Sequence, residues 1–177
     1  MESIRLKARA KINLGLDVIG RRENGYHDVR MVMQTVGLYD RIIMTRIPEE
    51  EIRIKTNIGF LPVNENNLVY KAIMLMKNKY KLDGGIEVDL NKFIPVAAGM
   101  AGGSSDAACA LFGMNRLFEL NVPMKELMKI GVEIGADVPY CLMRGTALAE
   151  GRGEILTKIA PCRSLQGFRI CHFVIFL

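Results

Sequence analysis

Residues 95–111, PVAAGMAGGSSDAACAL, form the stretch of this sequence that decides the fold. A proline-led, glycine-rich loop runs directly into Ser104 and Ser105, and apolar residues then recur at helical spacing. Glycine lacks a Cβ, so such a loop can adopt left-handed angles and approach a ligand closely. The unpaired amides at a helix start, with the positive end of the helix dipole, bind phosphate oxygens. We therefore expect a phosphate cradle at 95–105, with one serine capping the helix and the other hydroxyl facing a phosphate or a magnesium ion.

A plain loop with an N-cap is the commoner meaning of a glycine-serine run before a helix. Here, apart from Met100, the loop carries no bulky side chain, which favours the phosphate site. The loop does not follow the GxxxxGK[ST] pattern, because no lysine follows the glycines. It also lacks the GxGxxG spacing of dinucleotide-binding folds.

The composition predicts one globular domain or slightly more. The chain has 177 residues, of which 50% are hydrophobic and 24% charged, enough for a substantial core. Because no apolar run reaches membrane-spanning length and the N-terminus lacks the apolar segment of a signal peptide, we expect no membrane partner and a cytoplasmic location. The net charge of +5 suits an anionic small molecule and equally an RNA.

Cysteine and histidine usage does not indicate a metal centre. The residues concerned are Cys109, Cys141, Cys162, Cys171, His27 and His172. The cysteines form no CxxC pair, so we expect reduced and mostly buried thiols in place of disulfides or a zinc site. Two histidines are too few for a histidine-based metal site, and we predict no metal ligands among the side chains.

The order of elements predicts an α+β fold. Apolar residues occupy every even position from Ile4 to Val18, which indicates an extended segment with one apolar face. Asn24 and Gly25 predict a turn after it. Further strands are expected at 29–36, 38–47, 51–57, 85–91, 140–143, 146–150 and 154–159, and helices at 66–80, from 104 onward and at 124–134. Strands followed by mixed strands and helices with short loops favour antiparallel pairing over a doubly wound parallel sheet.

Lys11 and Asp137 are the candidates for chemistry on a bound triphosphate. Such a site needs a cation near the transferring phosphate and a group that receives or positions the acceptor hydroxyl. Lys11 and Asn13 lie on the polar face of the first strand, where a lysine is ordinarily a solvated side chain. Asp137 lies in an apolar loop where an unpaired carboxylate would be costly, which makes Lys11 its natural partner. An Asx turn at Asp137 that starts the next element is the equal alternative.

Tyr26 and His27 follow the turn glycine as two adjacent rings. Such rings can stack on a base or hydrogen-bond an acceptor molecule. A packed loop residue beside a surface histidine is the commoner arrangement.

These segments together resemble the GHMP kinases, whose second motif is a proline-led glycine loop running into Ser-Ser and a helix, as in PVAAGMAGGSSDAA. AKINLGLDVIGRRENGYHDVRMVMQTVGLYD at 10–40, ENNLVYKA at 65–72 and GADVPYCLMRGTALAEGRGE at 135–154 resemble one branch of that family. That branch phosphorylates a cytidine diphosphate-linked sugar alcohol in non-mevalonate isoprenoid (terpenoid) biosynthesis. The resemblance implies a domain over residues 1–160 like domain 2 of ribosomal protein S5, with the family's second, ferredoxin-like domain missing here.

The resemblance also implies residue roles, namely transfer of the γ-phosphate of ATP, with Mg²⁺, to the 2-hydroxyl of the sugar alcohol. Lys11 matches the family's catalytic lysine and Asp137 its catalytic aspartate. The residues that match the ATP site are Pro95, Val96, Ala97, Ala98, Gly99, Met100, Ala101, Gly102, Gly103, Ser104, Ser105, Asn67 and Leu68. Asn13, Tyr26 and His27 match the acceptor side, where the His27 ring would stack on cytosine. Ala101 replaces a glycine common in the family, which we expect to be harmless unless that position needs a positive φ.

Residues 161–177, PCRSLQGFRICHFVIFL, differ from the family, which continues into a KPP-type segment. This segment has no acidic residue and finishes on apolar side chains, so we expect a truncation or a shifted reading frame there. Two other functions stay open: a nucleotide-binding remnant that cannot catalyse, and a basic RNA-binding module of the S5 type. Dispersed lysines and a glycine loop without interleaved aromatics count against RNA, so we expect a small-molecule substrate and no nucleic acid. The sequence does not specify the oligomeric state.

Overall fold

A computed structural model describes residues 2–21, 25 and 27–160 of the chain. In chain order its elements are β1 (Ser3–Arg21), β2 (His27–Ile47), β3 (Ile52–Thr56), α1 (Leu68–Tyr80), β4 (Gly85–Asn91), α2 (Gly102–Leu117), α3 (Met124–Val132), α4 (Val138–Met143), β5 (Thr146–Glu150) and β6 (Ile155–Lys158). This order confirms the α+β class. Tyr26 and the segment 161–177 lie outside the described residues, so the expectations placed on them stay predictions.

The sheet is built around β2, and its strand order is β3-β4-β2-β5-β6, with β1 pairing along β2 as well. β1 and β2 are antiparallel from Ser3↔Thr45 to Arg21↔His27, as the turn at Gly25 predicts. One half of β2 then pairs with β4 and the other half with β5. Among the described strands only β3 and β4 run parallel, and α1 connects them.

The expected strands 29–36 and 38–47 form one continuous strand, because β1 supports β2 along its whole length. The register nevertheless shifts at the predicted break. Arg9 pairs with Tyr39 while Lys11 pairs with Thr35, so β2 bulges over residues 36–38. The bulge bends the pair where β1 carries Lys11.

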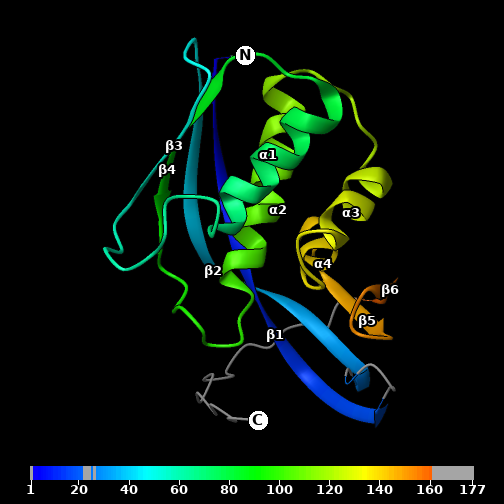
Figure 1. The fold of residues 1–177 in the computed structure, drawn as a ribbon. Coiled ribbons are helices and arrows are strands. Elements are labelled where there is room, and N and C mark those ends of the chain that lie inside the picture. Colours follow the sequence, from blue (N-terminus) through cyan, green and yellow to red (C-terminus); the bar gives the residue numbers. More distant parts are fainter. Residues whose placement is uncertain (1, 22–24, 26, 161–177) are drawn as a thin grey trace.

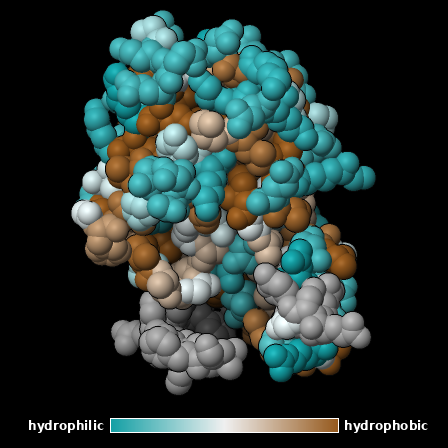
Figure 2. Space-filling model, viewed as in Figure 1, coloured by the Kyte–Doolittle hydropathy of each residue, from teal (hydrophilic) through white to brown (hydrophobic). Residues whose placement is uncertain are grey.

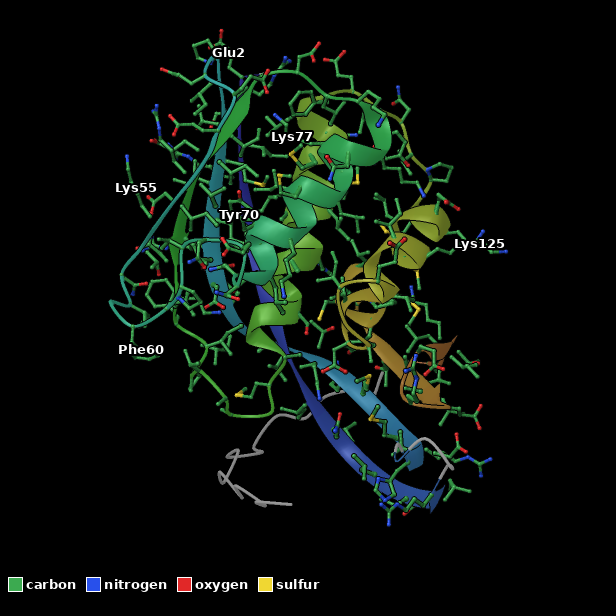
Figure 3. All side chains as sticks on the ribbon, in the orientation of Figure 1. Glu2, Lys55, Phe60, Tyr70, Lys77 and Lys125 are labelled. Atoms are coloured by element: carbon green, nitrogen blue, oxygen red, sulfur yellow. The ribbon has the colours of Figure 1, made fainter. Side chains whose placement is uncertain are left out.

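The helices cover one face of the sheet (Figure 1), and α2 contacts α1, α3, α4, β1 and β2. The core between them holds the fully buried side chains Met33, Ile42, Met44, Ile73, Met76, Leu111 and Met114. Gly113 lies where α2 packs closely on β2, and a Cβ there would force the Met44 side chain to move, because its sulfur lies too near. Charged side chains such as Lys55 and Lys125 lie at the periphery (Figure 3).

The β1–β2 ribbon continues beyond the helices (Figure 1), and here the expected apolar face fails. Ala8 and Ala10 are fully buried, whereas Leu14 is 43%, Leu16 47% and Val18 55% exposed. The register shifts again between Asn13↔Met33 and Gly15↔Val32, which breaks the alternation at Leu14. Perfect sequence alternation therefore does not make one buried face, because the outer half of the ribbon extends past the helices.

Two local predictions are wrong. Residues 140–143 belong to helix α4 and not to a strand, with Pro139 in its first turn. Helix α2 begins at Gly102 and not after a capping serine, because its N-cap is Ala101, which makes no side-chain cap bond. The hairpin of β5 and β6, the strand predictions at 51–57 and 85–91, and the helix at 66–80 are confirmed to within two residues at each end.

The visible face of the molecule mixes hydrophobic and hydrophilic residues (Figure 2). No helix among the described residues is long and apolar enough to cross a membrane.

Candidate functional site

The start of α2 is an uncapped helix N-terminus. The first helical hydrogen bond runs from the Ser105 amide to the Ala101 carbonyl, at 2.8 Å. The amides of Gly102, Gly103 and Ser104 therefore have no acceptor within the helix. Because α2 is 16 residues long and no side chain caps it, these amides and the helix dipole offer positive charge to an anion.

A cavity of about 440 Å³ opens at this helix start. The sequence-predicted residues that line it are Lys11, Asn67, Leu68, Pro95, Val96, Ala97, Ala98, Gly99, Met100, Ala101, Gly102, Gly103, Ser104 and Asp137. The other lining residues are Leu61, Leu90, Lys92 and Asp106. The structure thus brings the two candidate chemical groups and nearly all of the predicted loop around one space.

The loop is fastened to β1 at the bulge described above. The Lys11 amide donates to the Met100 carbonyl at 3.1 Å, and the Ser105 hydroxyl donates to the Arg9 carbonyl at 2.7 Å. Ser105 is buried, so its hydroxyl joins the loop to the sheet and is not a ligand-facing group. These contacts place Lys11 at the edge of the cradle.

Lys11 and Asp137 form an ion pair in the lining of the cavity. The Lys11 ammonium lies 3.8 Å from the Asp137 carboxylate and donates to the Asn13 amide oxygen at 3.2 Å. The lysine side chain is 7% exposed and the aspartate side chain 29% exposed, so the pair is shielded yet open to a ligand on one side. Lys11 is therefore not the solvated strand lysine of the common case.

The Asx-turn alternative for Asp137 is not observed. Asp137 is the N-cap residue of α4, but its side chain makes no cap hydrogen bond. The carboxylate is thus left to Lys11 and to the cavity. Its backbone carbonyl accepts from the Cys141 amide at 3.0 Å, which fixes the residue to the helix.

Asn67 has a structural role at the cavity wall. Its amide oxygen accepts from the Val69 amide at 2.8 Å and caps α1, while its nitrogen donates to the Pro62 carbonyl at 2.7 Å. Both polar groups are therefore already engaged. Leu68 beside it supplies an apolar wall, close to Gly103.

His27 is a predicted site residue that the structure places away from the cavity. It is exposed, begins β2 and pairs with Arg21, whereas the partner of Lys11 is Thr35. From 27 to 35 an extended strand spans about 26 Å. Asn13 lies next to Lys11, but it does not line the cavity.

Lys92 and Asp106 are site residues that sequence reasoning missed. Burial, with a smaller contribution from the neighbouring Asp40, raises the pKa of Asp106 to about 8 against the opposing charge of Lys92. No local motif marks these residues, because their partners lie on distant segments. The sequence offers two signals for them. Lys92 lies three residues before the loop proline, and Asp106 is an aspartate in a helix start that has few other charges.

Metal binding by side chains alone finds no support within the described residues, because no group of three or more His, Cys, Asp or Glu there could hold an ion. A magnesium ion in this cavity would take most of its oxygen ligands from phosphate and water, as is usual for this ion.

Comparison with known proteins places the chain beside one group of enzymes. Residues 67–145 match the model of the GHMP kinases N terminal domain. A 4-diphosphocytidyl-2-C-methyl-D-erythritol kinase of Lachnospira eligens is 90% identical over 175 residues, which cover 99% of this chain and 59% of that protein. The kinase of the same name from Lachnoclostridium phytofermentans is 61% identical over 161 residues, covering 91% of this chain and 55% of that protein. The chain therefore spans between half and two thirds of the length of these relatives.

Solved structures show the same relationship. A crystal structure of a 4-(cytidine 5'-diphospho)-2C-methyl-D-erythritol kinase has a TM-score of 0.77 and 35% identity, covering 89% of this chain and 55% of that chain. The mevalonate kinase of Methanococcus jannaschii has a TM-score of 0.68 and 16% identity, covering 89% of this chain and 56% of that chain. The second likeness shows a shared fold alone.

Proposed function

We propose that this chain, which carries the N-terminal domain of a GHMP kinase, binds ATP at the start of α2 and directs its γ-phosphate to an alcohol. One observation carries the proposal. The uncapped helix start and the Lys11–Asp137 pair line the same cavity, so an anion and a reacting hydroxyl can meet there. From the relatives' name we infer that the alcohol is the 2-hydroxyl of 4-diphosphocytidyl-2-C-methyl-D-erythritol.

In this proposal the phosphates of ATP lie against the free amides of residues 102–104, and Mg²⁺ arrives bound to them. Leu68 and the apolar loop residues offer a surface for the adenine ring. Asn67 contributes by holding the start of α1, because its side-chain groups are engaged in capping.

Asp137 accepts the proton of the acceptor hydroxyl as its oxygen bonds to the γ-phosphorus and ADP leaves. Lys11 lowers the cost of charge on the transferring phosphoryl group and holds the carboxylate in place. Asn13 orients the ammonium by accepting its hydrogen bond.

The acceptor side rests on the resemblance of RRENGYHD to the family. We propose that Asn13, Tyr26 and His27 contact the acceptor and that the His27 ring stacks on its cytosine. His27 lies far along the ribbon from Lys11, so this role requires the acceptor to extend along the ribbon or the ribbon end to fold towards the cavity.

The test is the substitution Asp137→Asn, with ATP binding measured by calorimetry and ADP formation measured with the cytidine-linked acceptor. We expect ATP affinity within about threefold of the unsubstituted chain, and turnover lower by about 10²–10⁴-fold. Turnover at the unsubstituted rate would overturn the role of Asp137. Thermal stabilisation by ATP without ADP formation in the unsubstituted chain would leave the binding site standing and remove the transfer step.

A further inference from the structure

Three ionisable side chains are buried together beneath the phosphate loop. Asp40 lies within β2, Lys92 directly follows β4, and Asp106 lies in the second turn of α2. The Lys92 side chain is 4% exposed, that of Asp40 0% and that of Asp106 2%. Burial of this kind is costly unless the charges are paired and hydrogen-bonded.

Lys92 joins the two acidic residues. Its ammonium donates to one oxygen of Asp40 and, at 2.6 Å, to Oδ2 of Asp106. Oδ1 of Asp106 is buried and has no hydrogen-bond partner among the described residues. The cluster thus links β2 to the start of α2 through one lysine.

The chain that enters the loop is fixed by the same cluster. The second oxygen of Asp40 accepts from the amides of Phe93 and Ile94, at 2.5 and 2.8 Å. The Asn57 side chain holds the backbone of Lys92 on both sides, accepting from its amide at 2.7 Å and donating to its carbonyl at 3.0 Å. Residues 92–94 therefore have a defined position on the sheet.

The chain that leaves the loop is fixed by the other half of the cluster. Asp106 anchors the second turn of α2, and the Lys92 ammonium reaches the first residue of that helix. A Cβ added at Gly102 would lie 3.2 Å from the Lys92 nitrogen and 3.1 Å from the Ile94 side chain. Lys92 thus lies against both ends of the segment 95–105.

We propose that Lys92, Asp40 and Asp106 form a positioning cluster that sets the distance between the two ends of the phosphate loop. The cluster thereby presents the amides of residues 102–104 in the geometry that receives ATP, a role that rests on the proposed function. Lys92 and Asp106 also line the cavity, and the contacts of the cluster in this structure are within itself and with the two ends of the loop, so we assign its members a positioning role. Its effect falls on nucleotide affinity more than on stability, because an apolar substitute for a buried ion cluster is often tolerated by the fold.

The test compares three variants of the 177-residue chain, with the affinity for ATP measured by calorimetry and amide hydrogen exchange measured over 96–104. Lys92→Met removes the cation between the Asp40 and Asp106 carboxyl groups, and we expect a Kd for ATP at least tenfold higher and faster exchange confined to the loop. Asp106→Asn keeps an acceptor for Lys92, so its loss should be smaller. A triple variant, Lys92→Met with Asp40→Asn and Asp106→Leu, removes the charges together, and we expect it to fold yet bind ATP as weakly as Lys92→Met.

The matched control is Asn115→Ala at the other end of α2. Asn115 is also buried and bonds Val122 through both its amide groups, so this variant loses stability without disturbing the loop. Its Kd for ATP should stay within twofold of the unsubstituted chain.

Unchanged ATP affinity and loop exchange in the folded triple variant would overturn the cluster's role. If the unsubstituted chain and Asn115→Ala both fail to bind ATP, the proposed function fails, while exchange over 96–104 still decides the positioning role. Equal acceleration of exchange over the whole chain in Lys92→Met and in the triple variant would reduce the cluster to a structural one.

Discussion

Ala101 combines a small side chain with a backbone angle that alanine rarely adopts. Its φ is 55°, in the left-handed region, and it is the N-cap residue of α2. Ala97 in the same loop has a φ of 60°. A left-handed alanine costs about 1–2 kcal/mol relative to the right-handed region, a cost that glycine does not carry. Residue 101 therefore has the positive φ at which an alanine is less favourable than the glycine common in the family.

Substitution of Ala101 by glycine should stabilise the protein. Relief of the left-handed angle exceeds the extra entropy that glycine gives the unfolded chain, which is about 0.5–1 kcal/mol. We expect a net gain of about 0.5–1 kcal/mol in the free energy of unfolding, measured by urea denaturation. Ala98→Gly is the control, because Ala98 is not among the residues with positive φ, and it should be neutral or destabilising. A loss of stability in Ala101→Gly would show that the angle is not strained.

Asp106 should make stability depend on pH. Burial raises its pKa from 3.8 to about 8, so between these values the folded state holds a proton that the unfolded state has released. The free energy of unfolding therefore falls as pH rises through this window, by at most about 1.4 kcal/mol per pH unit. Asp106→Asn replaces the titrating carboxyl group with an amide. The free energy of unfolding of the unsubstituted chain, minus that of the variant, should therefore decline from pH 5 to pH 8. Urea denaturation at unit intervals measures it, and a rising difference would contradict the assignment.

At the scale of elements, α4 is the piece that holds Asp137 in place. Its last turn is anchored by Tyr140, whose hydroxyl donates to the Gly145 carbonyl at 2.7 Å and lies 3.1 Å from the Thr35 hydroxyl. Thr35 in turn accepts from the Gly145 amide at 3.0 Å. One tyrosine thus joins α4, the residue that precedes β5, and β2, the strand that pairs with Lys11.

Replacement of Tyr140 by phenylalanine should therefore weaken this junction. It removes one hydroxyl from a buried network and leaves the Gly145 carbonyl without that donor, which costs about 1–2 kcal/mol in the free energy of unfolding. Tyr70→Phe on α1 is the comparison, because Tyr70 makes no side-chain hydrogen bond within the described residues. Equal urea midpoints for the two variants would contradict the anchoring role.

Elements with local signals were predictable from the sequence, and elements set by distant contacts were not. The hairpin of β5 and β6 follows from Gly151 and Gly153, both of which have positive φ. The all-apolar run of α4 carries no period that separates a helix from a strand, so it was misread. Of the two serines predicted as possible caps, Ser105 bonds a carbonyl of β1, and that partner is remote in sequence.

At the scale of the whole molecule, the cavity depends on segments from four parts of the chain. Lys11, Asp137 and the loop were predictable because each carries a family motif or an unusual setting. Lys92, Asp40 and Asp106 were not, because a buried charge is recognisable only once its partners and its burial are known.

Buried thiols give a measure of whole-molecule opening. Burial raises the pKa of Cys109 to about 12, and that of Cys141 is raised as well. A rise from 9 to about 12 lowers the thiolate fraction about a thousandfold, so alkylation should require unfolding. We expect iodoacetamide to label both residues at the rate of global unfolding, with each site located by peptide mass spectrometry. Labelling of the native protein at the rate of a free cysteine would contradict this expectation.

The outer half of β1 is more open than its inner half to pairing with a strand of another molecule. Within the described part of the chain β1 has β2 as its one strand partner; the backbone of its inner half also bonds Met100, Ser105 and Arg144, whereas none of these contacts reaches residues 14–19. The inner half carries three positive charges that disfavour pairing with a second copy of the strand, on Arg5, Lys7 and Arg9. From Leu14 to Ile19 only Asp17 is charged, among exposed apolar side chains. The growth of intermolecular sheet would therefore start on this outer half, and a single lysine at Leu16 would be enough to blunt it.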